Sequence, residues 1–190
     1  MDWKRNFLES SLLRRSTNKN NPNEVQAKCV DLAYSDMMTA GRYYSASFLN
    51  DKKEICSATN SAITESNFVF SRKIIEDISL LFCDNTIGNG NRYATGFGLA
   101  QKLINMTFKY LYVFSDLIFI DKPIPDFSSC DCPLDSIILN GIPYNKTVWS
   151  KFTKADYIKC QNKISDLLKS MTLDDELKSL GNMAYDFLNW

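Results

Sequence analysis

The chain has 190 residues, of which 45% are hydrophobic and 13% aromatic, so it can bury a substantial core. Its 22 lysines and arginines balance 22 aspartates and glutamates, and this neutral charge removes the general argument for a nucleic-acid-binding protein. The chain has no histidine, which excludes Ser-His-Asp and Cys-His catalysis and every histidine-containing metal site. Proton transfer must therefore use Asp, Glu, Lys, Tyr, Cys or bound water.

The cysteines and the start of the chain both indicate a reducing compartment. None of the six cysteines forms a C-x-x-C pair, and Cys130 and Cys132 are too close in sequence to make two good metal ligands. We therefore expect no metal site, no cofactor and no structural disulfide. The opening residues do not resemble a signal peptide, and no run reaches the ~18 apolar residues of a membrane span. The sequence predicts a cytoplasmic protein that does not contact membranes.

The N-terminal half has the periodicity of amphipathic helices. Apolar residues predict a short first helix over residues 3–12. A second helix is expected to use Asn23 as its N-cap and to end at Gly41. The pattern then stays helical over residues 43–83, with a break near residues 50–51.

The C-terminal half is expected to alternate between helices and irregular segments. Three prolines prevent a continuous helix over residues 115–132, and residues 117–120 fit either a short buried strand or a final helical turn. Thr153 and Asp156 resemble a capping box that opens a helix. The apolar residues near the chain end predict that the last helix docks on the core with Trp190 buried. The helices expected here cover residues 97–114, 135–139, 153–170 and 172–190. The whole pattern predicts an all-α fold, with residues 1–190 forming a single globular helical domain of about eight helices.

A glycine turn opens the helix expected over residues 97–114. Gly96 and Gly98 form a G-x-G sequence, and Lys102 follows one helical turn later. The first N–H groups of a helix can hold a phosphate, so this turn is a candidate phosphate site. The alternative is a tight turn without a ligand. No strand–helix–strand unit surrounds it, so a Rossmann nucleotide-binding fold is not indicated.

Together with Pro133-Leu134-Asp135, these residues resemble the helix-hairpin-helix DNA glycosylase superfamily over residues 95–139. The resemblance implies that Gly96 and Gly98 grip the DNA backbone. It also implies that Lys102 attacks the sugar C1′, as in bifunctional members, and that Asp135 stabilises the developing cation or activates the nucleophile. The chain departs from the family because Lys102 comes four residues after the second glycine rather than two. The lysine-to-aspartate gap is also longer, and the iron–sulfur cysteines of some members are absent.

Lys102 and Asp135 are candidate catalytic residues even without the resemblance to a family. An amine nucleophile must be partly neutral, and a neighbouring carboxylate can take its proton and stabilise a cationic transition state. The alternatives are ordinary. Lys102 would then be a surface residue with its ammonium group in water, and Asp135 would be the N-cap of the short helix.

Three polar residues share one face of the same helix. Gln101, Asn105 and Lys109 recur at spacings of four and are candidates for reading a base edge, while Trp149 is a candidate for stacking on a base. The alternatives are a solvated helix face and a core aromatic side chain. The rest of this helix is apolar nearly all round, which indicates burial, and buried polar groups must find partners.

These residues support two interpretations. The first is a helical protein that handles nucleic acid or a nucleotide, with Lys102 and Asp135 as the catalytic groups of a DNA N-glycosylase-like enzyme. Any DNA binding should be weak and salt-sensitive, because the sequence indicates no broad basic face. The alternative is a non-enzymatic phage or bacterial defence-related module that binds a protein partner or a small nucleotide. The distance between the Lys102 and Asp135 head groups discriminates between these interpretations, since groups more than about 10 Å apart could not react together.

Overall fold

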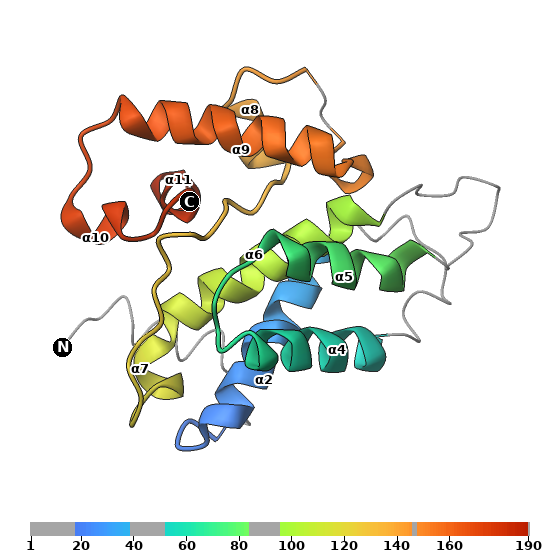
Figure 1. Cartoon of the computed structure of the whole chain (residues 1–190), viewed down its shortest axis with the longest axis vertical. Coiled ribbons are helices and arrows are strands. Elements are labelled where there is room, and N and C mark those ends of the chain that lie inside the picture. The colour runs from blue at the N-terminus through green and yellow to red at the C-terminus, as the bar shows by residue number, and fades with distance from the viewer. Residues whose placement is uncertain (1–17, 39–51, 84–95, 146–147, 190) are drawn as a thin grey trace.

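The computed structural model describes residues 18–38, 52–83, 96–145 and 148–189, which form an all-α structure (Figure 1). Within these ranges the chain forms nine α-helices and one 3-10 helix and contains no strand. The all-α class expected from the sequence is therefore confirmed. None of the described helices combines the length and apolar character that a membrane crossing requires. The elements are α2 (Pro22–Met37), α4 (Lys52–Glu65), α5 (Arg72–Cys83), α6 (Phe97–Val113), α7 (Ser115–Ile118), α8 (Ser136–Asn140), η2 (Trp149–Lys151), α9 (Lys154–Lys169), α10 (Asp175–Lys178) and α11 (Met183–Leu188).

Helix α6 runs through the centre of the described structure. Every residue from Phe97 to Leu111 is buried, as its apolar composition predicts. It contacts α2, α5, α7, α9 and η2. In Figure 1, α2, α4 and α5 lie on one side of α6, and α8, α9 and α11 lie on the other. The few polar side chains of α6 therefore meet groups from both ends of the sequence.

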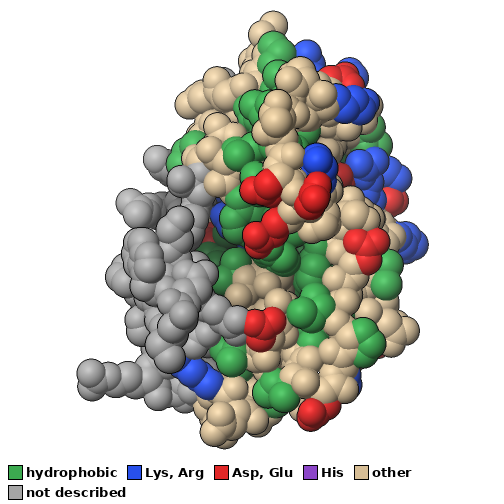
Figure 2. All heavy atoms as spheres, turned by 90° about the vertical axis from the view of Figure 1, so that its left-hand side faces the viewer, with side chains coloured by type: hydrophobic (Ala, Val, Ile, Leu, Met, Phe, Trp, Pro, Cys, Tyr) green, Lys and Arg blue, Asp and Glu red, His purple; other side chains and the backbone are tan. Residues whose placement is uncertain are grey.

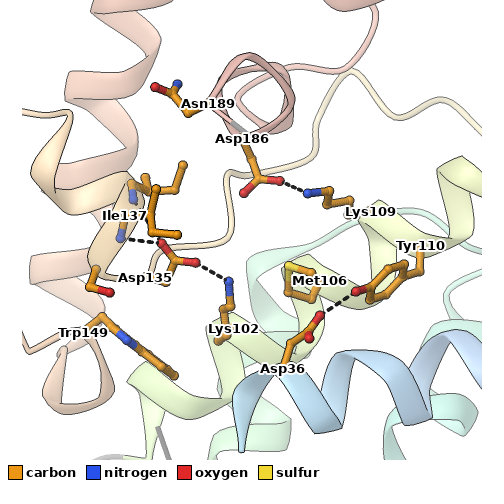
Figure 3. Close-up of a pocket in the computed structure, with 12 residues that line it drawn as sticks. Asp36, Lys102, Met106, Lys109, Tyr110, Asp135, Ile137, Trp149, Asp186 and Asn189 are labelled. Atoms are coloured by element: carbon orange, nitrogen blue, oxygen red, sulfur yellow. Dashed lines mark hydrogen bonds and ion pairs between the residues drawn. The ribbon is translucent and has the colours of Figure 1, made fainter. Parts of the chain in front are cut away.

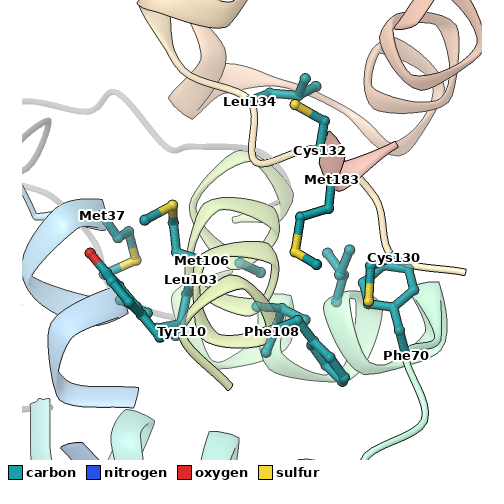
Figure 4. Close-up of a cluster of buried hydrophobic side chains, with 14 of the residues drawn as sticks. Met37, Phe70, Leu103, Met106, Phe108, Tyr110, Cys130, Cys132, Leu134 and Met183 are labelled. Atoms are coloured by element: carbon teal, nitrogen blue, oxygen red, sulfur yellow. The ribbon is translucent and has the colours of Figure 1, made fainter. Parts of the chain in front are cut away.

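The core around α6 contains aromatic and sulfur-containing side chains from both sides (Figure 4). Phe70 and Phe108 pack edge to face with their ring centroids 5.3 Å apart. Cys130 and Cys132 lie across α6 from Met37 and are free thiols. Burial raises the pKa of both thiols, so they stay protonated and act as small core side chains.

Local capping signals explain where several helices begin. The capping box is confirmed at α9, where the Asp156 N–H donates to Thr153 Oγ1 at 3.2 Å and the Thr153 N–H donates to Asp156 Oδ2 at 3.2 Å. Helix α2 begins earlier than predicted, because its N-cap is Asn21, whose side chain accepts the N–H of Asn23 at 3.2 Å. The assignment of Asn23 as the cap was wrong. Pro22 fits the first helical position because its missing N–H would have no partner there.

Two helix breaks were not predicted from the periodicity. Asn67 and Phe68 adopt positive φ angles of 52° and 61°, which a right-handed helix does not contain, so α4 and α5 are separate helices. Gly181 has φ +56° and separates α10 from α11, where one continuous helix was expected. A Cβ atom at Gly181 would lie 2.2 Å from the Ser128 carbonyl oxygen, so the chain needs glycine there.

The remaining expectations divide between described and undescribed parts of the chain. Residues 117–120 contain the end of α7 and no strand, which decides between the two alternatives in favour of a helical turn. The last helix, α11, buries Tyr185 against the core, whereas Leu188 is 44% exposed. Helix α2 ends at Met37 with Met38 as its C-cap, so the expected helix end at Gly41 was wrong. The expected first helix over residues 3–12, the break at residues 50–51 and the side chain of Trp190 lie outside the described residues.

Candidate functional site

A pocket of about 380 Å³ lies where α6 meets the C-terminal helices (Figure 3). Its volume lies within the range of small-molecule sites, which is about 300–1,000 Å³. Residues from α2, α6, η2 and α11 contribute to its wall, together with α8 and its cap. The described lining residues are Asp36, Lys102, Met106, Lys109, Tyr110, Asp135, Ser136, Ile137, Ile138, Trp149, Asp186 and Asn189.

Lys102 and Asp135 meet directly on the pocket wall. Lys102 Nζ lies 2.8 Å from Asp135 Oδ2, although the two residues are 33 positions apart in the sequence. The Lys102 side chain is only 7% exposed and that of Asp135 is 24% exposed. The surface-lysine alternative is therefore wrong. Charged groups that are this buried are normally paired, as they are here.

Asp135 uses its two oxygens for different purposes. Oδ1 accepts the N–H groups of Ile137 at 2.9 Å and Ile138 at 3.0 Å, which makes Asp135 the N-cap of α8. Oδ2 receives Lys102. Burial acts to raise the pKa of Asp135, but the charge of Lys102 and these hydrogen bonds outweigh it and lower the pKa below its usual value. Asp135 is therefore both the N-cap of α8 and a pocket residue, and its carboxylate is ionised before any reaction.

A second ion pair joins α6 to α11. Lys109 lies two turns after Lys102 and pairs with Asp186, with side-chain exposures of 2% and 6%. Lys109 Nζ also lies 5.0 Å from the centroid of the Phe187 ring, within cation–π distance. The alternative that Lys109 lies on a solvated helix face is therefore wrong. It attaches the C-terminal helix to the pocket wall.

A third polar contact joins α6 to α2. The Tyr110 hydroxyl donates to Asp36 Oδ2 at 2.5 Å. Burial and this hydrogen bond raise the pKa of Tyr110, so the phenol keeps its proton. Figure 3 shows the three pairs arranged around Met106. The pocket is therefore lined by two ion pairs, by the hydrogen bond between Tyr110 and Asp36, and by the apolar side chains of Met106, Ile137, Ile138 and Trp149.

Gln101 and Asn105 do not line the pocket, although the sequence made them candidates for binding a substrate. Gln101 Nε2 donates to the Leu134 carbonyl at 2.9 Å, and its Oε1 accepts the Leu134 N–H at 3.1 Å. Asn105 Nδ2 donates to the Tyr157 hydroxyl at 2.9 Å and to the Cys132 carbonyl at 3.3 Å. Both side chains are buried, and they fasten the segment before Asp135 to α6.

Gly96 and Gly98 are buried where α6 packs against α5 and η2. Gly96 has φ +56°, and a Cβ atom there would lie 2.5 Å from the Ser79 carbonyl oxygen. A Cβ atom on Gly98 would lie 2.3 Å from the Trp149 carbonyl oxygen. The close approach of backbones explains both glycines without a bound phosphate. The structure gives these glycines a packing role, and Gly98 lies against the backbone of Trp149, a residue that lines the pocket.

Gly98→Ala is expected to lower the free energy of unfolding by about 1–3 kcal/mol, since the new methyl group must push η2 away from α6. Urea denaturation measures the change. Ser57→Ala, at an exposed position of α4, is the control and should change stability by less than about 0.5 kcal/mol. A Gly98→Ala protein as stable as the control would show that the close approach is not required.

The structure brings half of the predicted site residues together. Lys102, Asp135, Lys109 and Trp149 line the pocket, whereas the two glycines and the two amide residues lie in the surrounding packing. Sequence reasoning did not place the other lining residues at the site, among them Asp36, Met106, Asp186 and Asn189. The two missed aspartates lie 74 and 77 positions from their partners, so no local spacing could have found them.

No protein-family model matches the chain, and comparisons with curated proteins and with solved structures give no significant match. The resemblance to helix-hairpin-helix glycosylases therefore stays a prediction from the order of a few residues. Among the described residues, no three His, Cys, Asp or Glu side chains are grouped in a way that could hold a metal ion. The chemistry that these residues can offer comes from the lysine, carboxylate and tyrosine side chains of the pocket.

Proposed function

We propose that the pocket binds a nucleoside-type group and that Lys102 and Asp135 cleave its N-glycosidic bond. The observation that carries the proposal is the 2.8 Å contact between Lys102 Nζ and Asp135 Oδ2 on the wall of the pocket. The separation is far below the limit of about 10 Å beyond which the two groups could not react together. Trp149 lines the same pocket and supplies an aromatic ring against which a base can pack.

The reaction needs one proton donor and one anion, and the pair supplies both. Breaking the bond between C1′ and the base nitrogen leaves its electron pair on the base, and the ammonium group of Lys102 donates a proton to that nitrogen. The Asp135 carboxylate stabilises the positive charge on C1′ and accepts a proton from the water that attacks it. The two groups touch, so this proton can pass from Asp135 to Lys102 and restore the starting state.

A covalent route uses the same two residues. The base leaves with the bonding electrons and takes a proton from the Lys102 ammonium group, and the neutral amine then attacks C1′, whose positive charge the Asp135 carboxylate stabilises. Opening of the sugar ring gives a Schiff base. Borohydride reduces this Schiff base to a stable amine, so trapping distinguishes the covalent route from direct hydrolysis.

The test is release of free base, measured by liquid chromatography, from nucleosides and from DNA that contains modified bases. Parallel samples contain borohydride. Lys102→Met and Asp135→Asn are expected to abolish base release. Asparagine caps helices about as well as aspartate, so Asp135→Asn should retain α8. Lys159→Met, at an exposed position of α9, is the matched control and should keep full activity. Release that survives in either pocket variant would contradict the assigned roles.

The second candidate function is a binding module without chemistry. The observation that favours it is that the charged groups of the described pocket already have partners: Lys102 pairs with Asp135, Lys109 pairs with Asp186, and Asp36 accepts the Tyr110 hydroxyl. Such pairs can simply hold helices together. A ligand that raises the melting temperature without losing its base would support this candidate.

A further inference from the structure

We infer that the ligand of this pocket is an uncharged nucleoside rather than a phosphate-bearing nucleotide or a DNA strand. The inference rests on the proposed function and concerns the substrate class of the same pocket. It is carried by the volume of the pocket, the nature of its walls and the way its charges are arranged.

The volume and the walls suit one small, flat, partly apolar group. A pocket of about 380 Å³ is near the lower end of small-molecule sites, which favours a single molecule over a stretch of polymer. Trp149 and Met106 contribute an aromatic and a polarisable surface from two different elements. Both kinds of surface pack well against the face of a base.

The arrangement of charges on the pocket wall disfavours the binding of a phosphate. The described lining contains three aspartates and two lysines, and each lysine already contacts an aspartate. A phosphate that reached Lys102 or Lys109 would have to displace a carboxylate that is itself partly or fully buried, and it would lie beside the negative charges of the others. The hydroxyl and amino groups of a nucleoside are hydrogen-bond donors, and carboxylates can accept their hydrogen bonds without such repulsion.

The described residues on one face of the molecule give no support for a polyanion either. Figure 2 shows acidic side chains near the centre of one face and lysines and arginines mainly along its edge. Binding to a DNA backbone draws mainly on a continuous basic surface. On this face the described residues do not form one.

The experiment measures the binding of C-nucleosides, whose base is joined to the sugar by a carbon–carbon bond and so cannot be released by N-glycosidic cleavage. Pseudouridine and formycin are titrated into the full-length protein by calorimetry, next to their 5′-monophosphates. We expect at least one nucleoside to bind ten-fold or more tightly than its monophosphate. Equal or tighter binding of the monophosphate, or no binding of either nucleoside at millimolar concentration, would overturn the inference.

A pair of variants tests whether the carboxylates cause the discrimination. Asp36→Asn retains an oxygen that can accept the hydrogen bond of the Tyr110 hydroxyl but removes one negative charge from the pocket. It should therefore reduce the ratio of the nucleoside affinity to the monophosphate affinity. Asp31→Asn is the matched control, because Asp31 lies on the same helix, pairs with Lys52 and does not line the pocket. An unchanged ratio in Asp36→Asn would contradict the role of that carboxylate.

The results also separate this inference from the proposed function. C-nucleosides that bind while no nucleoside loses its base would refute the enzyme and leave the ligand class standing. Base release from a substrate whose monophosphate binds more tightly would refute the ligand class and leave the enzyme standing.

Discussion

Replacing Lys109 by methionine is expected to lower the free energy of unfolding by about 3–5 kcal/mol. The cause is the carboxylate of Asp186, which would remain buried after its cation is removed. Methionine keeps most of the apolar stem of lysine, so the lost charge, and not a cavity, should dominate the result. Urea denaturation at neutral pH, followed by circular dichroism, measures the change.

Two comparisons identify the cause. The double variant Lys109→Met, Asp186→Leu should lose less stability than the sum of the single variants, because it leaves no buried charge alone. Lys169→Met is the matched control, since Lys169 and Asp166 form a pair whose side chains are 72% and 74% exposed. Exposed pairs are worth only about 0–1 kcal/mol. A Lys109 variant as stable as this control would refute the structural role of the buried pair.

The Lys109–Asp186 pair also affects the candidate site. Both residues line the pocket, and α11 supplies part of its wall. Loss of the pair should therefore weaken ligand binding together with stability. Lys102→Met differs in this respect, because its partner Asp135 is still held by the N–H groups of α8. A comparison of the two lysines separates a residue that builds the pocket from one that is proposed to react in it.

The parts of the fold that follow local rules could be predicted from the sequence. Helix α6 was found because its apolar run is long, and α9 was found because Thr153 and Asp156 satisfy each other at its start. The breaks at Asn67 and Gly181 could not be found in the same way. Each depends on a left-handed backbone conformation, and Gly181 also needs space beside Ser128, which is distant in the sequence.

The candidate site could likewise be predicted from the sequence only in part. Lys102 and Asp135 were singled out from the order of a few motifs, and the structure brings them together. Asp36 could not be predicted, because it becomes a pocket residue only when α2 packs against α6. Gln101 and Asn105 show the opposite error. Their spacing placed them correctly on one face with Lys109, but these two side chains meet the backbone of Cys132 and Leu134, whereas Lys109 reaches the pocket.

Removal of residues 185–190 is expected to destabilise the protein by several kcal/mol. Tyr185 is buried, and its hydroxyl donates to the Gly141 carbonyl at 2.9 Å. Asp186 neutralises Lys109, and the Phe187 ring lies 5.6 Å from that of Tyr112. Burial of one large apolar side chain contributes about 1.5–3 kcal/mol, and a broken buried ion pair costs about 3–5 kcal/mol.

The combined loss in this truncation is comparable with the whole stability of an average domain, which is about 5–15 kcal/mol. We therefore expect the truncated protein to lose its cooperative thermal transition or to melt at a much lower temperature, as measured by calorimetry. Leu188→Ser is the control, because this side chain of α11 is 44% exposed and should matter little. If the truncation left the melting temperature unchanged, the aromatic end would not hold the described helices together. It would be better explained as a surface that binds a partner, and the non-enzymatic module would then become the stronger hypothesis.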